Sequence, residues 1–111
     1  MGALMLAGAL SAALAAGAAQ GGLLNGQVRH GAQLAQRCEA CHAIGQADHG
    51  RNSGALAFRV LARRNNPIGL EQALRRIVKS GHYQMRPVAI SESDATDIAA
   101  YIATLAEPPT R

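Results

Sequence analysis

The residues with the clearest chemical potential are Cys-Glu-Ala-Cys-His, positions 38–42 of a chain of 111 residues. Cys38 and Cys41 are the only two cysteines, and His42 directly follows the second. The pattern is compatible with three chemistries: a dithiol/disulfide redox pair, part of a zinc site, or covalent attachment of a haem. The rest of the sequence has to discriminate between them.

The first two chemistries fit the sequence poorly. A dithiol redox motif normally follows a strand in a βαβ unit, and no such pattern surrounds these cysteines. A zinc site would take both thiols and His42, with a fourth ligand from His30, His49 or His82. However, Cys41 and His42 are adjacent, which makes it awkward for both to reach one tetrahedral ion, and there is no second cysteine pair.

Haem attachment gives each part of the motif a physical reason. The two thiols add to the two vinyl groups of a haem, so their spacing must match the porphyrin edge. The next residue then lies beneath the ring and offers an imidazole nitrogen to the iron. We therefore predict one haem c, attached through Cys38 and Cys41, with His42 as an axial ligand.

A second axial ligand is predicted at Met85. The other two methionines lie within the first five residues, so Met85 is the only one in the rest of the chain. It belongs to a polar loop that contains a proline, where core filling is a poorer explanation than in a helix stripe. His82 is the alternative ligand, whereas His30 and His49 are interpreted as solvent-facing.

The first 19 residues are apolar and small and carry no charged side chain. This pattern is typical of a secretory signal peptide, with cleavage after Ala18 or Ala19. No Lys or Arg precedes the run, so an uncleaved anchor is the alternative, although the length is near the lower limit for a membrane span. We expect a periplasmic protein, in keeping with haem attachment outside the cytoplasm, which contacts the membrane only if the segment stays uncut.

The remaining chain is short of core-forming side chains, with one Phe, two Tyr and no Trp. Small domains of this kind usually gain stability from disulfides, a metal or a cofactor. A disulfide between Cys38 and Cys41 would close only a tiny loop and so constrain the unfolded chain very little. A large apolar cofactor would supply the missing core.

Hydrophobic spacing predicts an all-α domain over residues 28–107, preceded by a flexible leader (20–27) and followed by a short tail (108–111). In chain order, the predicted elements are a helix from Val28 into Cys38, an irregular loop at 45–56, a brief helix at 57–64, a helix with an apolar stripe from Leu70 to Val78 that Gly81 ends, an irregular loop around Met85, and a last helix capped by Ser91 or Ser93. No strand pattern is found.

Residues 28–106 resemble a small class I c-type cytochrome, with the motifs in the family's order. In that family a glycine of the N-terminal helix packs against an aromatic residue of the C-terminal helix, and Gly31 and Tyr101 match these positions. VKSGHYQMRP (78–87) resembles the loop that carries the distal methionine. SGALAFRVLARR (53–64) resembles the segment in which Pro-Pro often stands in place of Leu56-Ala57.

This resemblance implies a cytochrome c-like bundle of three to five helices around one covalently bound haem. It also implies electron transfer with a six-coordinate His42/Met85 iron, and therefore no catalytic residue. We expect a periplasmic monohaem electron carrier rather than an enzyme. The alternatives are a cytochrome c subunit that serves as the electron outlet of a dehydrogenase or oxidase complex, and a gas-binding haem protein if Met85 is not a ligand.

The net charge of +4 is unevenly distributed. Seven basic residues and one acid, Glu71, lie between positions 59 and 86; the basic ones are Arg59, Arg63, Arg64, Arg75, Arg76, Lys79 and Arg86. They predict docking onto an acidic face of a redox protein partner, with an ordinary solvated helix face as the alternative. Arg59 or Arg63 is the candidate for neutralising the haem propionates. Nucleic acid is not an expected partner, because no aromatic stacking residues accompany the arginines.

Overall fold

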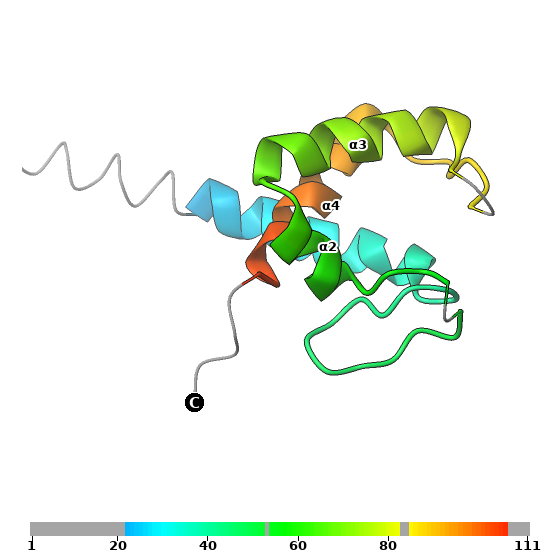
Figure 1. Ribbon diagram of the computed structural model, residues 1–111. Helices are drawn as coiled ribbons and strands as arrows, with labels where there is room; N and C mark the ends of the chain where they lie inside the picture. Colours follow the sequence, from blue (N-terminus) through cyan, green and yellow to red (C-terminus); the bar gives the residue numbers. More distant parts are fainter. Residues whose placement is uncertain (1–21, 53, 83–84, 107–111) are drawn as a thin grey trace, which may run out of the picture.

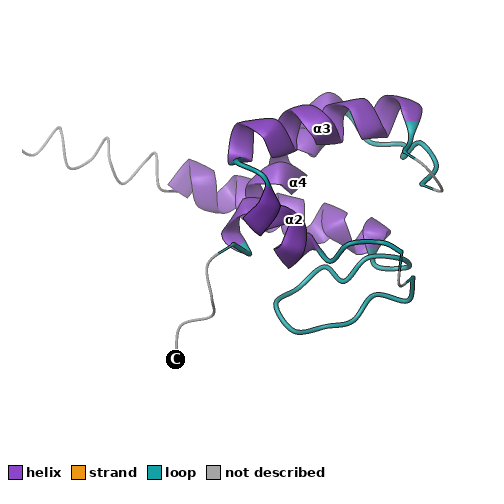
Figure 2. Cartoon of the chain, viewed as in Figure 1, coloured by secondary structure: helices purple, strands orange, loops and turns teal. Residues whose placement is uncertain are grey.

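The computed structural model describes residues 22–52, 54–82 and 85–106, and these residues form an all-α structure (Figures 1 and 2). Its elements are a helical segment at 22–35, a 3₁₀ turn η1 (Gln36–Cys38), and the helices α2 (Phe58–Arg64), α3 (Pro67–Ser80) and α4 (Glu92–Thr104). The described residues contain no strand, only an isolated antiparallel bridge between His82 and Met85. The predicted all-α class is confirmed.

The core collects apolar side chains from every helix around α4, which packs against both α2 and α3. Ile98 and Ile102 of α4 are each 1% exposed and are the largest fully buried side chains among the described residues. Phe58 of α2 and Leu70 of α3 belong to the same cluster. Because these positions recur at helical spacing, the stripes of α3 and α4 face each other across this core.

The N-terminal helical segment crosses α4 at very short range. A Cβ atom added at Gly31 would overlap the backbone carbonyl of Asp97 and lie 2.9 Å from the Cβ of Tyr101. Only a residue without a side chain fits at this crossing. The expected close approach of Gly31 and Tyr101 is therefore confirmed. Next to it, Nδ1 of His30 lies 2.7 Å from Oδ2 of Asp97.

Local sequence signals account for the helix ends. The side chain of Asn66 accepts a hydrogen bond of 2.7 Å from the Gly69 N–H, with Pro67 as the first helical residue of α3. Gly81 ends this helix with a positive φ of 73°. Ser91, one of the two predicted caps, starts α4 through a capping box with Asp94.

The predicted flexible leader is wrong for residues 22–27, which are helical and continue directly into the segment that packs on α4. The reason is cooperative: once the segment around Gly31 is fixed by packing, each preceding residue adds a helical hydrogen bond without a new nucleation cost. The predicted signal segment (1–19) and tail (108–111) lie outside the described residues. Within the described ranges, no helix is both long enough and apolar enough to span a membrane.

Ion pairs connect α3 to α4 on the outer surface. Arg75 lies 3.0 Å from the carboxylate of Glu71 and 3.4 Å from that of Glu92, and it donates to the Thr96 hydroxyl at 2.8 Å. Lys79 also pairs with Glu92. The pKa of Glu92 is lowered, chiefly by the hydrogen bond from Lys79 and by its charge. These contacts align the two helices that flank the Met85 loop.

Candidate functional site

The two thiols and the histidine of the motif lie in one backbone turn at the end of η1. The Cys41 and His42 N–H groups both donate to the carbonyl of Cys38, at 3.2 and 3.0 Å. Both thiols are free; Cys41 is exposed and Cys38 is partly buried against the core. Burial raises the pKa of the Cys38 thiol, against the opposing charge of Arg37. The structure thus presents two reduced thiols and one imidazole from a single turn.

The imidazole of His42 is oriented by a backbone carbonyl. Its Nδ1 lies 2.6 Å from the carbonyl oxygen of Leu56, and its ring packs at a centroid distance of 5.3 Å from that of Phe58. A carbonyl only accepts hydrogen bonds, so Nδ1 carries the proton and Nε2 of the neutral ring keeps its lone pair. Histidines that bind metals are commonly held in this way.

The loop that carries Leu56 is laid over the backbone of the motif. The Asn52 N–H donates to the Cys41 carbonyl at 3.3 Å, and the Phe58 N–H donates to the Ala43 carbonyl at 2.8 Å. A Cβ atom at Gly50 would lie 2.5 Å from the Cys41 carbonyl oxygen. The predicted irregular loop is confirmed for residues 45–52 and 54–56, and its close packing holds the hydrogen-bond acceptor of His42 in place.

Residues 44–48 form a turn held from three directions, which we call the 44–48 turn. The carboxylate of Asp48 accepts from the N–H groups of Ile44 (2.9 Å) and Gly45 (2.8 Å). Arg59 of α2 donates to the carbonyls of Gly45 (3.2 Å) and Asp48 (2.9 Å). From α4, the Tyr101 hydroxyl donates to the Ile44 carbonyl at 2.5 Å. The turn that follows His42 is thereby tied to both helices.

The sequence did not predict this turn, and it predicted another role for Arg59. Arg59 was one of two arginines suggested for the haem propionates, but its guanidinium donates to the 44–48 turn, while Arg63 is exposed. The local signal for this turn was Asp48, which follows the donors Gly45 and Ile44 by three and four residues, respectively. Nothing in the local sequence identified Tyr101 as its distant donor.

Met85 lies on a separate segment that returns to the same end of the molecule. The His82 N–H donates to the Met85 carbonyl at 2.9 Å, and the Met85 N–H donates to the His82 carbonyl at 2.7 Å. Residues 83–84 lie outside the described ranges. Further along, the Ala89 carbonyl accepts a hydrogen bond of 3.4 Å from Arg37, which directly precedes Cys38. In Figure 1 the Met85 segment (yellow) and the end of η1 (cyan) both lie on the right.

The structure therefore joins Cys38, Cys41 and His42 in one turn and links the segment after Met85 to this turn through the hydrogen bond from Arg37 to Ala89. The half-buried apolar residues packed against the core include Leu61, Leu74 and Ile90, which come from α2, α3 and the Met85 segment. In the described part of the chain, no three His, Cys, Asp or Glu side chains gather as metal ligands.

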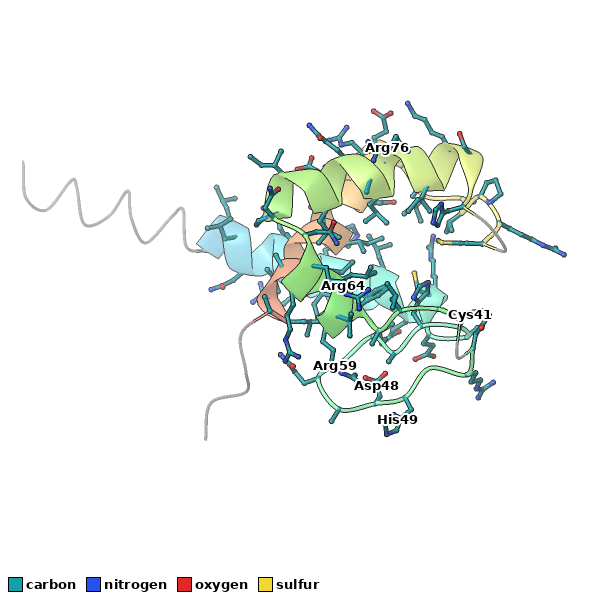
Figure 3. The ribbon with its side chains drawn as sticks, in the orientation of Figure 1. Cys41, Asp48, His49, Arg59, Arg64 and Arg76 are labelled. Carbon is teal, nitrogen blue, oxygen red and sulfur yellow. The ribbon has the colours of Figure 1, made fainter. Side chains whose placement is uncertain are left out.

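Three of the seven basic residues between positions 59 and 86 form ion pairs with carboxylates, which leaves fewer unpaired positive charges than the sequence indicated. Arg59 pairs with Asp48, and the ion pairs between α3 and α4 engage Arg75 and Lys79. The exposed remainder consists of Arg63, Arg64, Arg76 and Arg86. Figure 3 shows Arg64 and Arg76 on α2 and α3, respectively.

No family model, curated protein or solved structure matched this chain in the three comparisons. The functional interpretation therefore depends on the residues themselves. Their chemistry is that of two reduced thiols three positions apart, an imidazole oriented through Nδ1, and a thioether on a neighbouring loop.

Proposed function

We propose that this protein is a periplasmic monohaem c-type cytochrome that carries single electrons between redox partners. Cys38 and Cys41 would hold one haem c covalently, and His42 and Met85 would be its axial ligands. The observation that carries the proposal is the hydrogen bond from Nδ1 of His42 to the Leu56 carbonyl, because it leaves Nε2 available to a metal. A dithiol redox pair gives no role to a histidine oriented in this way.

The residues present fit the cofactor. Two free thiols at the end of a 3₁₀ turn suit attachment to neighbouring vinyl groups, and the imidazole of the next residue is oriented by the Leu56 carbonyl. Phe58 belongs to the core, and the half-buried Leu61, Leu74 and Ile90 pack against it, so these side chains would supply an apolar environment. A small domain with so few aromatic residues would gain its missing core from a large apolar group.

Bound haem supplies reversible one-electron chemistry, while the protein supplies attachment, orientation and electrostatics. His42 and Met85 would supply the two protein ligands of the iron, so small oxidants would find no open coordination site. A thioether ligand also raises the reduction potential, because it stabilises the ferrous state. This is a carrier rather than an enzyme, and no side chain takes part in breaking or forming substrate bonds.

The test is an absorption spectrum of the protein co-expressed with haem-maturation machinery. We expect a covalent c-type spectrum and, in the ferric state, the weak charge-transfer band of iron–thioether ligation. Met85→Ala should lose this band, whereas Arg86→Ala, the matched control one residue away, should keep it. Cys38→Ala leaves Cys41 as the only thiol, so the haem should be attached through at most one thioether bond.

Two results would contradict the proposal in different ways. If the wild type attaches no haem, the interpretation of the Cys-x-x-Cys-His motif is wrong, and zinc binding or thiol redox chemistry must be reconsidered. If haem is attached but the thioether band is absent and the reduced wild type binds carbon monoxide, the iron has an open site. A gas-binding function would then replace electron transfer.

A further inference from the structure

His82 and Met85 form an antiparallel pair in which each N–H donates to the carbonyl of the other residue, at 2.9 and 2.7 Å. Two residues that exchange both hydrogen bonds lie directly opposite each other, and their side chains project from the same face of the pair. Their Cβ atoms are then about 5 Å apart. Whichever way the Met85 side chain faces, the His82 side chain faces the same way.

The backbone around this pair is closely packed on its N-terminal side. Gly81 has a φ of 73°, which disfavours any residue with a side chain. A Cβ atom there would lie 2.6 Å from the Met85 carbonyl oxygen and 3.1 Å from Cδ of Pro87. The chain on the other side is attached to the body of the molecule through Ala89 and Ile90. The pairing of His82 with Met85 is therefore built into the loop.

From this pairing we propose that the Met85 segment carries a second potential iron ligand, His82. His82 would bind the iron in place of Met85 when the Met85 thioether dissociates. The inference rests on the proposed function. In the exchange, the bond from the Met85 sulfur to iron would break, and an unprotonated ring nitrogen of His82 would donate its lone pair to form the new bond. Neither an electron nor a proton would be transferred.

The other described histidines are placed differently. His30 lies 2.7 Å from Asp97 at the crossing of the N-terminal segment with α4. His49 lies on the 45–56 loop, at the lower edge of the molecule in Figure 3. His82 also borders an open groove of about 550 Å³ along the C-terminal half of α3. Among these three histidines, His82 is the one whose backbone pairs with Met85.

The test uses the haem-loaded protein and reads the spin state of the iron rather than electron-transfer activity. In Met85→Ala we expect a ferric spectrum that is low-spin and lacks the thioether band, together with a lower reduction potential because imidazole replaces thioether. The double variant Met85→Ala/His82→Ala should become high-spin. If His82 occupies the position about nine-tenths of the time, its removal raises the apparent affinity for carbon monoxide about tenfold.

Two controls isolate the role of the imidazole. Met85→Ala/His49→Ala should behave like Met85→Ala, because His49 lies on another loop. His82→Ala alone should keep the thioether band, which would show that the loop still delivers Met85. A Met85→Ala protein that is already high-spin, or that is indistinguishable from the double variant, would overturn the proposal. So would loss of the band in His82→Ala alone. Failure of the proposed function is a separate result, namely a wild type without covalent haem.

Discussion

The hydrogen bond that orients His42 depends on side chains outside the motif. Leu56 accepts it, and the loop that carries Leu56 begins at the 44–48 turn. Asp48 and Tyr101 each hold the backbone of Ile44, one through its N–H and the other through its carbonyl. These two residues therefore support the orientation of His42 through the backbone of the loop. Both can be tested by substitutions that nearly preserve shape.

Asp48→Asn should destabilise the protein at neutral pH and have little effect in acid. Partial burial favours the neutral acid, but the N–H groups of Ile44 and Gly45 and the charge of Arg59 outweigh it, so the pKa of Asp48 lies below its usual value of 3.8. A lowered pKa stabilises the fold above that usual value, and the contribution is lost as the pH falls through the folded-state pKa. Because the group is largely exposed, we expect a loss of roughly 1 kcal/mol at most.

Urea unfolding at neutral pH and below pH 3.8 would measure this difference. Glu39→Gln, at another exposed carboxylate, is the control and should change the unfolding midpoint little at either pH. An Asp48→Asn effect of the same size at both pH values would show that the charge of the carboxylate is not what stabilises the turn.

Tyr101→Phe should remove the hydroxyl that donates to Ile44 and cost about 1 kcal/mol in the free energy of unfolding. Burial, with a further contribution from the charge of Asp48, raises the pKa of Tyr101 above its usual value of 10.0. A raised pKa stabilises the fold below that usual value, and the contribution is lost as the pH rises through the folded-state pKa. The wild type should therefore approach the variant in stability in strong alkali. A difference that persists there would contradict the role of the hydroxyl proton.

At the scale of the elements, the helix ends were predictable because their signals are local. Ser91, Asn66 and Gly81 act on backbone groups within a few residues of themselves. The contact between Gly31 and Tyr101 was predictable only through the family resemblance. Asp48 gave a local signal for the 44–48 turn, but the Tyr101 donor had none, because Tyr101 and Ile44 are 57 positions apart and no local pattern links them. The helical state of residues 22–27 was missed for a related reason, since it depends on packing that begins after them.

Gly31→Ala should be strongly destabilising, because the added Cβ would overlap the Asp97 carbonyl of α4. Overpacking of this kind typically costs about 1–3 kcal/mol. Gly26→Ala is a matched control in the same helical segment, where the new Cβ would meet nothing within 4 Å. It should be neutral or stabilise by about 0.5–1 kcal/mol, because alanine favours the helix.

Midpoints of urea unfolding, followed by far-ultraviolet circular dichroism, would compare the two variants directly. If Gly31→Ala is as stable as Gly26→Ala, the helices do not cross as closely as the structure describes. If both variants unfold at lower urea concentrations than the wild type, the helical segment requires glycine at both positions.

For the whole molecule, the distribution of charge bears on how a partner would approach. Arg75 and Lys79 are engaged by carboxylates on α3 and α4, whereas Arg86 directly follows Met85 and is exposed. Arg29 is also exposed but belongs to the N-terminal helical segment. In Figure 1 that segment begins on the left, whereas the Met85 segment lies on the right. The two arginines therefore lie on different segments of the exposed surface.

Arg86→Glu should slow oxidation of the reduced haem protein by hexacyanoferrate(III), an anionic oxidant, several-fold at low ionic strength. The effect should shrink at high salt, where exposed charges are screened. Arg29→Glu has the same change in net charge and is expected to have a much smaller effect. Stopped-flow rates over a range of salt concentrations would measure both. Equal slowing in the two variants would mean that net charge, rather than the position of Arg86, determines the rate.

The crossing at Gly31 also has a consequence for when the chain folds during its synthesis. His30 and Asp97, which meet beside this crossing, are separated by 67 positions, so one of the closest contacts in the fold joins its first and last described helices. Until α4 has left the ribosome, the earlier helices lack the surface on which they pack. A nascent chain that ends before Ser91 is therefore expected to remain unfolded and sensitive to protease. In such a chain both thiols of the motif stay accessible until the last segment is released.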